Sequence, residues 1–142
     1  FVQYLVNGSS DCMTKGAADG VLRLIYVLEG DAKLDGTAIR VPTPNVSAVD
    51  LTFEAKRDVT VEEVNAAVQT AAAGHMGAVL SYDPEPKVSI DFNHTTYSSI
   101  FAPDQTKVVG GRTVRVLAWY DNEWGFSARM ADVAAAIGRL NQ

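Results

Sequence analysis

The sequence predicts an α+β domain in which helices pack on one face of a mostly antiparallel sheet. Runs that alternate apolar and polar residues follow one another along the chain, as strands with one buried face do. A glycine pair joins two such runs, which is typical of a hairpin. Stretches with apolar residues at helical spacing interrupt the strands. The 142 residues are 47 % hydrophobic, which is enough for one domain with a substantial core.

The first 30 residues predict a short strand and a helix. Residues 1–6 are apolar enough for the strand, and a cluster of Gly, Ser and Asp then predicts a turn. Apolar residues recur at helical spacing over 17–28, and Gly30 is suited to end that helix. Because the chain opens on Phe1, we expect it to be processed, trimmed or part of something longer.

Pro42 and Pro44 divide the next apolar stretch into two extended pieces. The second piece alternates regularly, which predicts a strand with one buried face. The residues expected on that face are Val49, Leu51, Phe53 and Ala55.

The clearest helix is expected from about residue 60 to Gly74, which is suited to end it. Thr60 and Glu63 have the spacing of a capping box. The apolar stripe of this helix comprises Val61, Val64, Ala67, Val68 and Ala71.

The last half of the chain predicts strands followed by one helix. Residues 77–92 suggest two short strands around a proline-rich turn, because Val88, Ile90 and Phe92 alternate with polar residues. A further strand is expected within 97–101, and Gly110 and Gly111 predict a hairpin. The final helix should cover 126–140, with a stripe of Met130, Val133, Ala134, Ile137 and Leu140.

Composition excludes several classes of function. The net charge is −5 without a basic patch, which argues against nucleic acid, and no apolar stretch is long enough to enter a membrane as a helix. The single cysteine, Cys12, excludes an internal disulfide framework and a cysteine metal cage. Because a free thiol suits a reducing compartment, we expect a cytoplasmic protein. Neither a dinucleotide-binding glycine motif nor a phosphate-binding loop is present.

Three residues could be reactive. Cys12 would be activated if a helix began near 15–17, although a half-buried loop thiol is the favoured interpretation. His75 follows a helix-ending glycine and is expected in a solvated turn. His94 could serve as a base, but no nucleophile lies near it in the sequence.

Two polar features need partners. Arg40 lies inside an apolar strand, so it must meet either a carboxylate or a bound anion. Asp121, Asn122 and Glu123 lie between a strand and a helix, where the acids are suited to capping. Capping leaves unexplained why Asn122 has aromatic neighbours, which are Trp119, Tyr120 and Trp124.

Four motifs together resemble the C-terminal part of phosphorylating glyceraldehyde-3-phosphate dehydrogenase, and erythrose-4-phosphate dehydrogenases look similar. They are "KLDGTAIRVPTPNVSAVDL", "VSIDFNH", "YSSIF" and "WYDNEWGFS". The resemblance implies a single truncated domain over 1–142, with 1–30 divergent and 31–142 family-like. It also implies half of a catalytic domain, built as a mostly antiparallel sheet backed by helices.

The resemblance also implies binding roles. Arg40 matches an arginine that helps hold substrate or inorganic phosphate, and Gly16 lies at a phosphate-binding turn. Asn122 matches the asparagine that holds the carboxamide of the nicotinamide ring. Phe126 stands where the family often has tyrosine, and Cys12 does not coincide with the family's nucleophile.

The family's nucleophilic cysteine, histidine base and NAD-binding domain all precede this region and have no counterpart in the chain. We therefore expect no catalytic residue here, no cofactor bound by the chain alone, and NAD only if a dinucleotide-binding partner brings it. The first hypothesis is a pseudoenzyme: a structural or partner-binding module, forming a homo-oligomer or larger assembly through its apolar sheet face and final helix. The second is a fragment, or one chain of a split NAD-dependent enzyme of glycolysis or the Calvin cycle. The third is a phosphate or nucleotide sensor.

Overall fold

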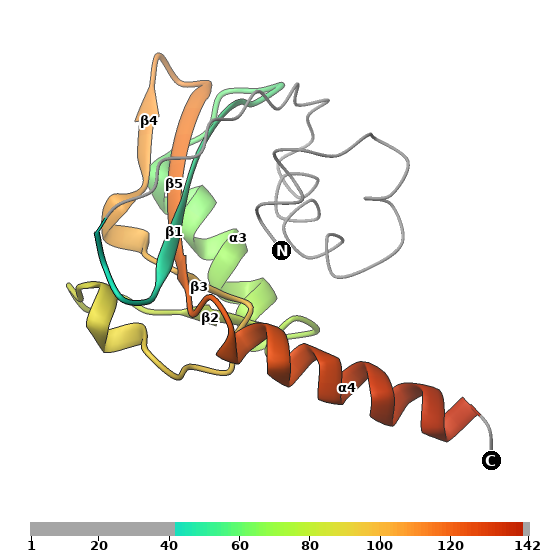
Figure 1. Cartoon of the computed structure of the whole chain (residues 1–142). Helices are drawn as coiled ribbons and strands as arrows, with labels where there is room; N and C mark the ends of the chain where they lie inside the picture. The colour runs from blue at the N-terminus through green and yellow to red at the C-terminus, as the bar shows by residue number, and fades with distance from the viewer. Residues whose placement is uncertain (1–41, 141–142) are drawn as a thin grey trace.

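The computed structural model describes residues 42–140, and the strand and helix expected within the first 30 residues lie outside this range (Figure 1). The described elements are β1 (Ser47–Glu54), α3 (Val61–Ala73), β2 (Leu80–Tyr82), the 3-10 helix η1 (Ser89–Phe92), β3 (Ser99–Phe101), the 3-10 helix η2 (Pro103–Gln105), β4 (Lys107–Val109), β5 (Thr113–Tyr120) and α4 (Trp124–Leu140).

Within residues 42–140 the sheet has five strands, and β5 pairs with three of the others. The order is β1-β5-β3-β2, and β4 also pairs with β5. All pairs with β5 are antiparallel, and the longest runs from Ser47 opposite Tyr120 to Glu54 opposite Thr113. Only β2 and β3 are parallel among the described strands. The predicted α+β class with a mostly antiparallel sheet is therefore confirmed.

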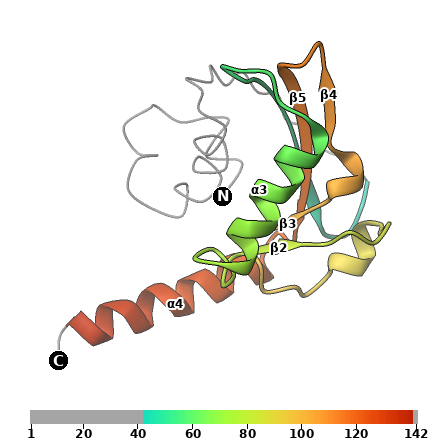
Figure 2. The same cartoon turned by 180° about the vertical axis from the view of Figure 1, so that it is seen from behind.

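Helix α3 covers one face of this sheet, as both views show (Figures 1 and 2). Its predicted capping box is present: the Glu63 N–H donates to the Thr60 hydroxyl at 3.2 Å, and the Thr60 N–H donates to the Glu63 carboxylate at 2.9 Å. The stripe residues Val64, Val68 and Ala71 are buried. They join a core that includes Phe53, Phe101, Val114 and Val116 from the sheet.

The glycine pair forms the predicted hairpin between β4 and β5. Gly110 and Gly111 have φ angles of +61° and +77°. This left-handed region is open to glycine at little cost, whereas other residues are strained there. The two glycines therefore let the chain reverse between Val109 and Thr113, which pair across the hairpin.

The strand expected around residues 88–92 is wrong, because this segment forms the 3-10 helix η1. The Asp91 carboxylate accepts from the Val88 N–H at 2.9 Å, and the Asp91 N–H donates back to the Val88 carbonyl. These local bonds close a turn and compete with a strand ladder. As a result Val88 and Ile90 are 63 % and 68 % exposed, and only Phe92 is buried.

Helix α4 leaves the end of β5 and extends away from the sheet (Figure 1). It is anchored near its start, where Gly125 is buried and a Cβ there would lie 2.7 Å from the Tyr97 carbonyl oxygen. The predicted helix is confirmed, but its apolar stripe does not pack on the sheet as α3 does, and Val133 is 56 % exposed. None of the described helices is long and apolar enough to cross a membrane.

Candidate functional site

The buried carboxylate of Asp121 organises the turn between β5 and α4. One oxygen, Oδ1, accepts from the backbone N–H groups of Glu123 at 3.0 Å and Trp124 at 2.6 Å. The other, Oδ2, accepts from the His94 backbone N–H at 2.8 Å and from Asn45 Nδ2 at 2.7 Å. Asp121 is only 2 % exposed. The capping role expected for Asp121 is therefore confirmed, and the structure adds two partners distant in sequence.

These contacts keep the carboxylate charged. Burial alone would raise the pKa of Asp121, but hydrogen bonds from Trp124, His94, Asn45 and Glu123 outweigh it and lower the pKa below its ordinary value. Hydrogen bonds to the charged form of an acid favour that form. Asp121 is thus a fixed, acceptor-only group at the base of the turn.

Asn45 connects this carboxylate to Asn122. Its Nδ2 group donates to Asp121 and to the Asn93 side-chain oxygen, both at 2.7 Å, and its Oδ1 accepts from the Asn122 backbone N–H at 3.4 Å. Asn45 was not among the residues predicted for the site. Its only local signal is that an amide side chain directly follows Pro44 and precedes a strand.

Asn122 is exposed, and its side chain is nevertheless held. Its Oδ1 accepts from the Ser47 hydroxyl, with 2.5 Å between the two oxygens. Among residues 42–140, the Nδ2 group of Asn122 has no protein acceptor. This group can therefore donate to a ligand.

The aromatic neighbours of Asn122 have partners of their own. Trp119 stacks on Phe92, with ring centroids 5.5 Å apart, in a small cluster with Val46 and Ile100. Trp124 lies against the His94 ring, with centroids 4.7 Å apart. These contacts pack Trp119 and Trp124 against neighbouring rings, which accounts for two of the three aromatic residues that flank Asn122.

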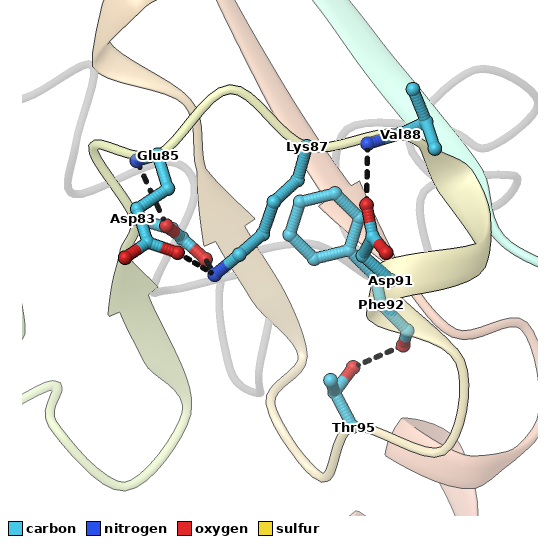
Figure 3. Close-up of polar contacts among 7 residues, drawn as sticks. All are labelled: Asp83, Glu85, Lys87, Val88, Asp91, Phe92 and Thr95. Carbon is cyan, nitrogen blue, oxygen red and sulfur yellow. Dashed lines mark hydrogen bonds and ion pairs between the residues drawn. The ribbon is translucent and has the colours of Figure 1, made fainter.

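The loop that supplies Asn93 and His94 is held by its own polar contacts (Figure 3). Lys87 Nζ lies 2.5 Å from the Asp83 carboxylate and 3.1 Å from that of Glu85. Hydrogen bonds to these acids raise the pKa of Lys87. Farther along, the Thr95 hydroxyl donates to the Phe92 carbonyl at 2.7 Å. The loop therefore presents its backbone to Asp121 in a defined shape.

Of the other predicted site residues, the structure describes only the two histidines. Arg40, Gly16 and Cys12 lie outside the described residues. His75 is exposed in the turn after α3, as expected. His94 contributes its backbone N–H and a ring contact, which is a structural role. In the described part of the chain, no group of three or more His, Cys, Asp or Glu residues is suited to hold a metal ion.

Comparison with known proteins agrees with the resemblance. Residues 12–122 match the family model described as glyceraldehyde 3-phosphate dehydrogenase, C-terminal domain. The chain is 62 % identical to the glyceraldehyde-3-phosphate dehydrogenase of Cereibacter sphaeroides over 125 residues, which are 88 % of this chain and 37 % of the relative. The corresponding enzyme of Xanthobacter flavus is 56 % identical over 125 residues, again 88 % of this chain and 37 % of the relative.

The enzyme of Geobacillus stearothermophilus is 51 % identical over 124 residues, which are 87 % of this chain and 36 % of that relative. The chain thus spans little more than a third of the length of the curated relatives it matches. The matched region includes Asn45, Ser47, Asp121 and Asn122. The chain therefore belongs to the glyceraldehyde-3-phosphate dehydrogenase family and corresponds to part of its C-terminal domain.

Proposed function

We propose that this chain supplies the C-terminal segment of the catalytic domain in an NAD-dependent glyceraldehyde-3-phosphate dehydrogenase. Its contribution is a preformed contact for the nicotinamide carboxamide. The observation that carries the proposal is the exposed Asn122 side chain, held by Ser47 with its Nδ2 group unpaired in the described residues. It occurs in a chain that is 62 % identical to a dehydrogenase of this family.

The residues present fit that task. NAD, when bound, supplies the hydride acceptor of the reaction. Asn122 would donate from Nδ2 to the carboxamide oxygen, and such a contact limits rotation of the attached ring. Ser47 contacts the Asn122 side chain and Asn45 contacts its backbone before a ligand arrives, and this preorganisation would lower the entropy cost of binding.

Phosphate binding falls to other residues of the chain under this proposal. Arg40 would contact substrate or inorganic phosphate, since a planar guanidinium binds oxyanions through two parallel hydrogen bonds. Gly16 would allow the backbone to approach a phosphate at a turn. A phosphate or nucleotide sensor would depend on these same two residues, which lie outside the described range.

Under this proposal the chain alone does not catalyse the reaction. A nucleophile and a base would come from the remainder of the enzyme, as the family resemblance implies. The chain would orient the nicotinamide ring and supply a charged group for phosphate. The reacting groups and most of the dinucleotide site would lie in the remainder of the enzyme.

Complementation tests the proposal. The full chain would be assayed for NADH formation with glyceraldehyde 3-phosphate, phosphate and NAD, alone and after co-refolding with the part of the Cereibacter sphaeroides enzyme that precedes the match. We expect no turnover alone and measurable turnover in the mixture, reduced by Asn122→Ala. Turnover by the chain alone would contradict its predicted inactivity, and an inactive but stable complex would overturn the proposed split activity.

A second candidate function is a non-catalytic module that binds a partner. It is favoured by the apolar stripe of α4, which stays exposed along the helix at Met130, Val133, Ile137 and Leu140. Exposed apolar patches of this kind promote association. Sedimentation should then show a homo-oligomer, and a monomer that persists at high concentration would count against this candidate.

A further inference from the structure

We propose that helix α4 is built in two parts, of which only the first folds together with the rest of the domain. The fixed part is residues 124–129, and the free part is residues 130–140. In solution the free part loses and regains its helical structure while α3 and the sheet stay folded. This inference does not depend on the proposed function, because it follows from the contacts of α4 within the chain.

The start of the fixed part is held by a cap and by close packing. The Asp121 carboxylate accepts from the Trp124 N–H at 2.6 Å, which satisfies a donor of the first helical turn. Gly125 is buried, and a Cβ at this position would lie only 2.7 Å from the Tyr97 carbonyl oxygen. The first turn of α4 therefore lies directly on the loop that precedes β3.

Arg129 marks the end of the fixed part. Its Nη1 donates to the carbonyls of Ala78 and Thr96 and to the Ser98 hydroxyl, each at 3.3 Å. Its Nε donates to the Asp132 carboxylate at 2.8 Å, but Asp132 belongs to the same helix. In the described part of the chain, Arg129 is thus the last residue of α4 whose side chain bonds to another element.

The free part has no comparable anchor. Every residue from Met130 to Leu140 is exposed, and this end of α4 extends beyond the sheet in both views (Figures 1 and 2). Because the free part buries little apolar surface against the domain, the hydrogen bonds and residue preferences of the helix itself must hold it. Isolated helices shorter than about 12 to 15 residues are marginal in water for this reason.

Opening of the free part can begin at its exposed end and costs little. Adding one residue to an existing helix changes the equilibrium by a factor of only about 1 to 1.6 for good helix formers. Gly138 lies inside the free part, and glycine is about fivefold less favourable than alanine in a helix interior. The opened and helical forms of the free part are therefore both populated.

Helix α3 is the internal reference for this behaviour. Its residues Val64 and Val68 are no more than 1 % exposed, because they pack in the core against the sheet. Opening α3 would uncover that core, so its amides exchange with solvent only when the whole domain opens. A change in the core should therefore act on α3 without acting on the free part of α4.

The division bears on the exposed apolar stripe. Its first member, Phe126, lies on the fixed part and stays presented on a rigid turn. The other members, which are Met130, Val133, Ile137 and Leu140, lie on the free part. Any association that used the whole stripe would have to order the free part, and ordering on binding lowers the affinity that a given interface area provides.

Amide hydrogen exchange of the full chain, read residue by residue by NMR, tests the proposal. Gly138→Ala should slow exchange at the Ala134 and Ile137 amides about fivefold, because opening them also undoes position 138. Exchange at the Ala71 amide of α3 should not change. Ala135→Gly is the matched opposite and should speed exchange at Ala134 and Ile137 by a similar factor.

Val68→Ala tests the same division from the side of the core. It should speed exchange at the Ala71 amide more than about tenfold, because it lowers the stability of the whole domain. Exchange at Ala134 and Ile137 should stay as in the wild type. If Val68→Ala does not fold, Gly138→Ala and Ala135→Gly decide the question without it, since both changes lie at exposed positions.

Three results would overturn the proposal. In one, Val68→Ala speeds exchange in the free part as much as in α3, so that α4 opens only with the domain. In another, Gly138→Ala slows the Ala71 amide as much as the Ala134 amide. In the third, exchange in the free part slows as protein concentration rises, which would show that a second copy of the chain covers it.

Discussion

Helices α3 and α4 have the same kind of apolar stripe but opposite surroundings. In α3, Val64 and Val68 are no more than 1 % exposed against the sheet. In α4, Val133 and Ile137 are 56 % and 55 % exposed. Apolar periodicity thus predicts that a helix forms and which side is apolar, but not whether a partner in the same chain covers that side.

The two helices are also held differently. Helix α3 is stabilised along its length by the core, whereas α4 is held at its first turns by Asp121, by Gly125 and by Arg129. The Arg129 guanidinium contacts the carbonyls of Ala78 and Thr96, each at 3.3 Å. Changes at the start of α4 should therefore matter more than changes along its stripe.

The largest effect is expected at Asp121. Asp121→Ala removes the acceptor for four donors in a buried place, and unpaired buried polar groups are costly. We expect a loss of about 3 kcal/mol in the free energy of unfolding, measured with urea, because hydrogen bonds to a charged group are among the strongest in proteins. A loss below about 1 kcal/mol would mean that water replaces these contacts and that the start of α4 is not held as described.

A matched valine pair tests the contrast between the helices directly. Val68→Ala opens a cavity in the core and should cost about 2 kcal/mol in the free energy of unfolding. Val133→Ala changes an exposed position and should stay within about 0.5 kcal/mol. Equal losses in the two variants would show that the α4 stripe is covered in solution, and the comparison should then be repeated across protein concentrations.

Removing the cap of α3 should have a smaller effect. Thr60→Ala deletes the hydroxyl that accepts from the Glu63 N–H and should lower the free energy of unfolding by about 1 kcal/mol. Thr60→Ser keeps the acceptor and is the matched control. If both variants lose the same amount, the capping hydrogen bond is not the cause.

The smallest effect is expected from a change in pH. The folded-state pKa of Asp121 is lowered, so its stabilising contribution is complete above the unfolded pKa of about 3.9 and is lost as pH falls through the folded value. The stability difference between wild type and Asp121→Asn should therefore shrink as pH falls below about 4. A difference that stays constant across this range would show that the folded-state pKa is not lowered.

Much of the fold follows from short-range patterns. The capping box at Thr60, the alternation in β1 and the glycine pair before β5 each depend on residues close together in the chain. The 88–92 segment was mispredicted although its pattern is also local, because Asp91 bonds to its own backbone and competes with strand alternation. The parallel pairing of β2 with β3 has no comparable local signal, since register depends on packing.

The candidate site likewise has one part that short-range patterns predict and one part that they do not. The Asp121 cap was predicted from its place between a strand and a helix, and the ligand contact of Asn122 stays a prediction that rests on a family motif. Asn45 was missed because it meets Asp121 across 76 positions of sequence. No pattern in its neighbours predicts that contact.

By itself, then, the sequence determined the family, the two described α-helices, the hairpin and the cap at Asp121. Only the tertiary structure decided that Asn45 and Ser47 contact Asn122, and that α4 leaves the sheet with its stripe exposed. The physical reason is how far apart in the sequence the interacting residues lie. Helix, turn and cap preferences arise between residues a few positions apart, whereas closing a loop of dozens of residues costs entropy that only packing of the whole sheet repays.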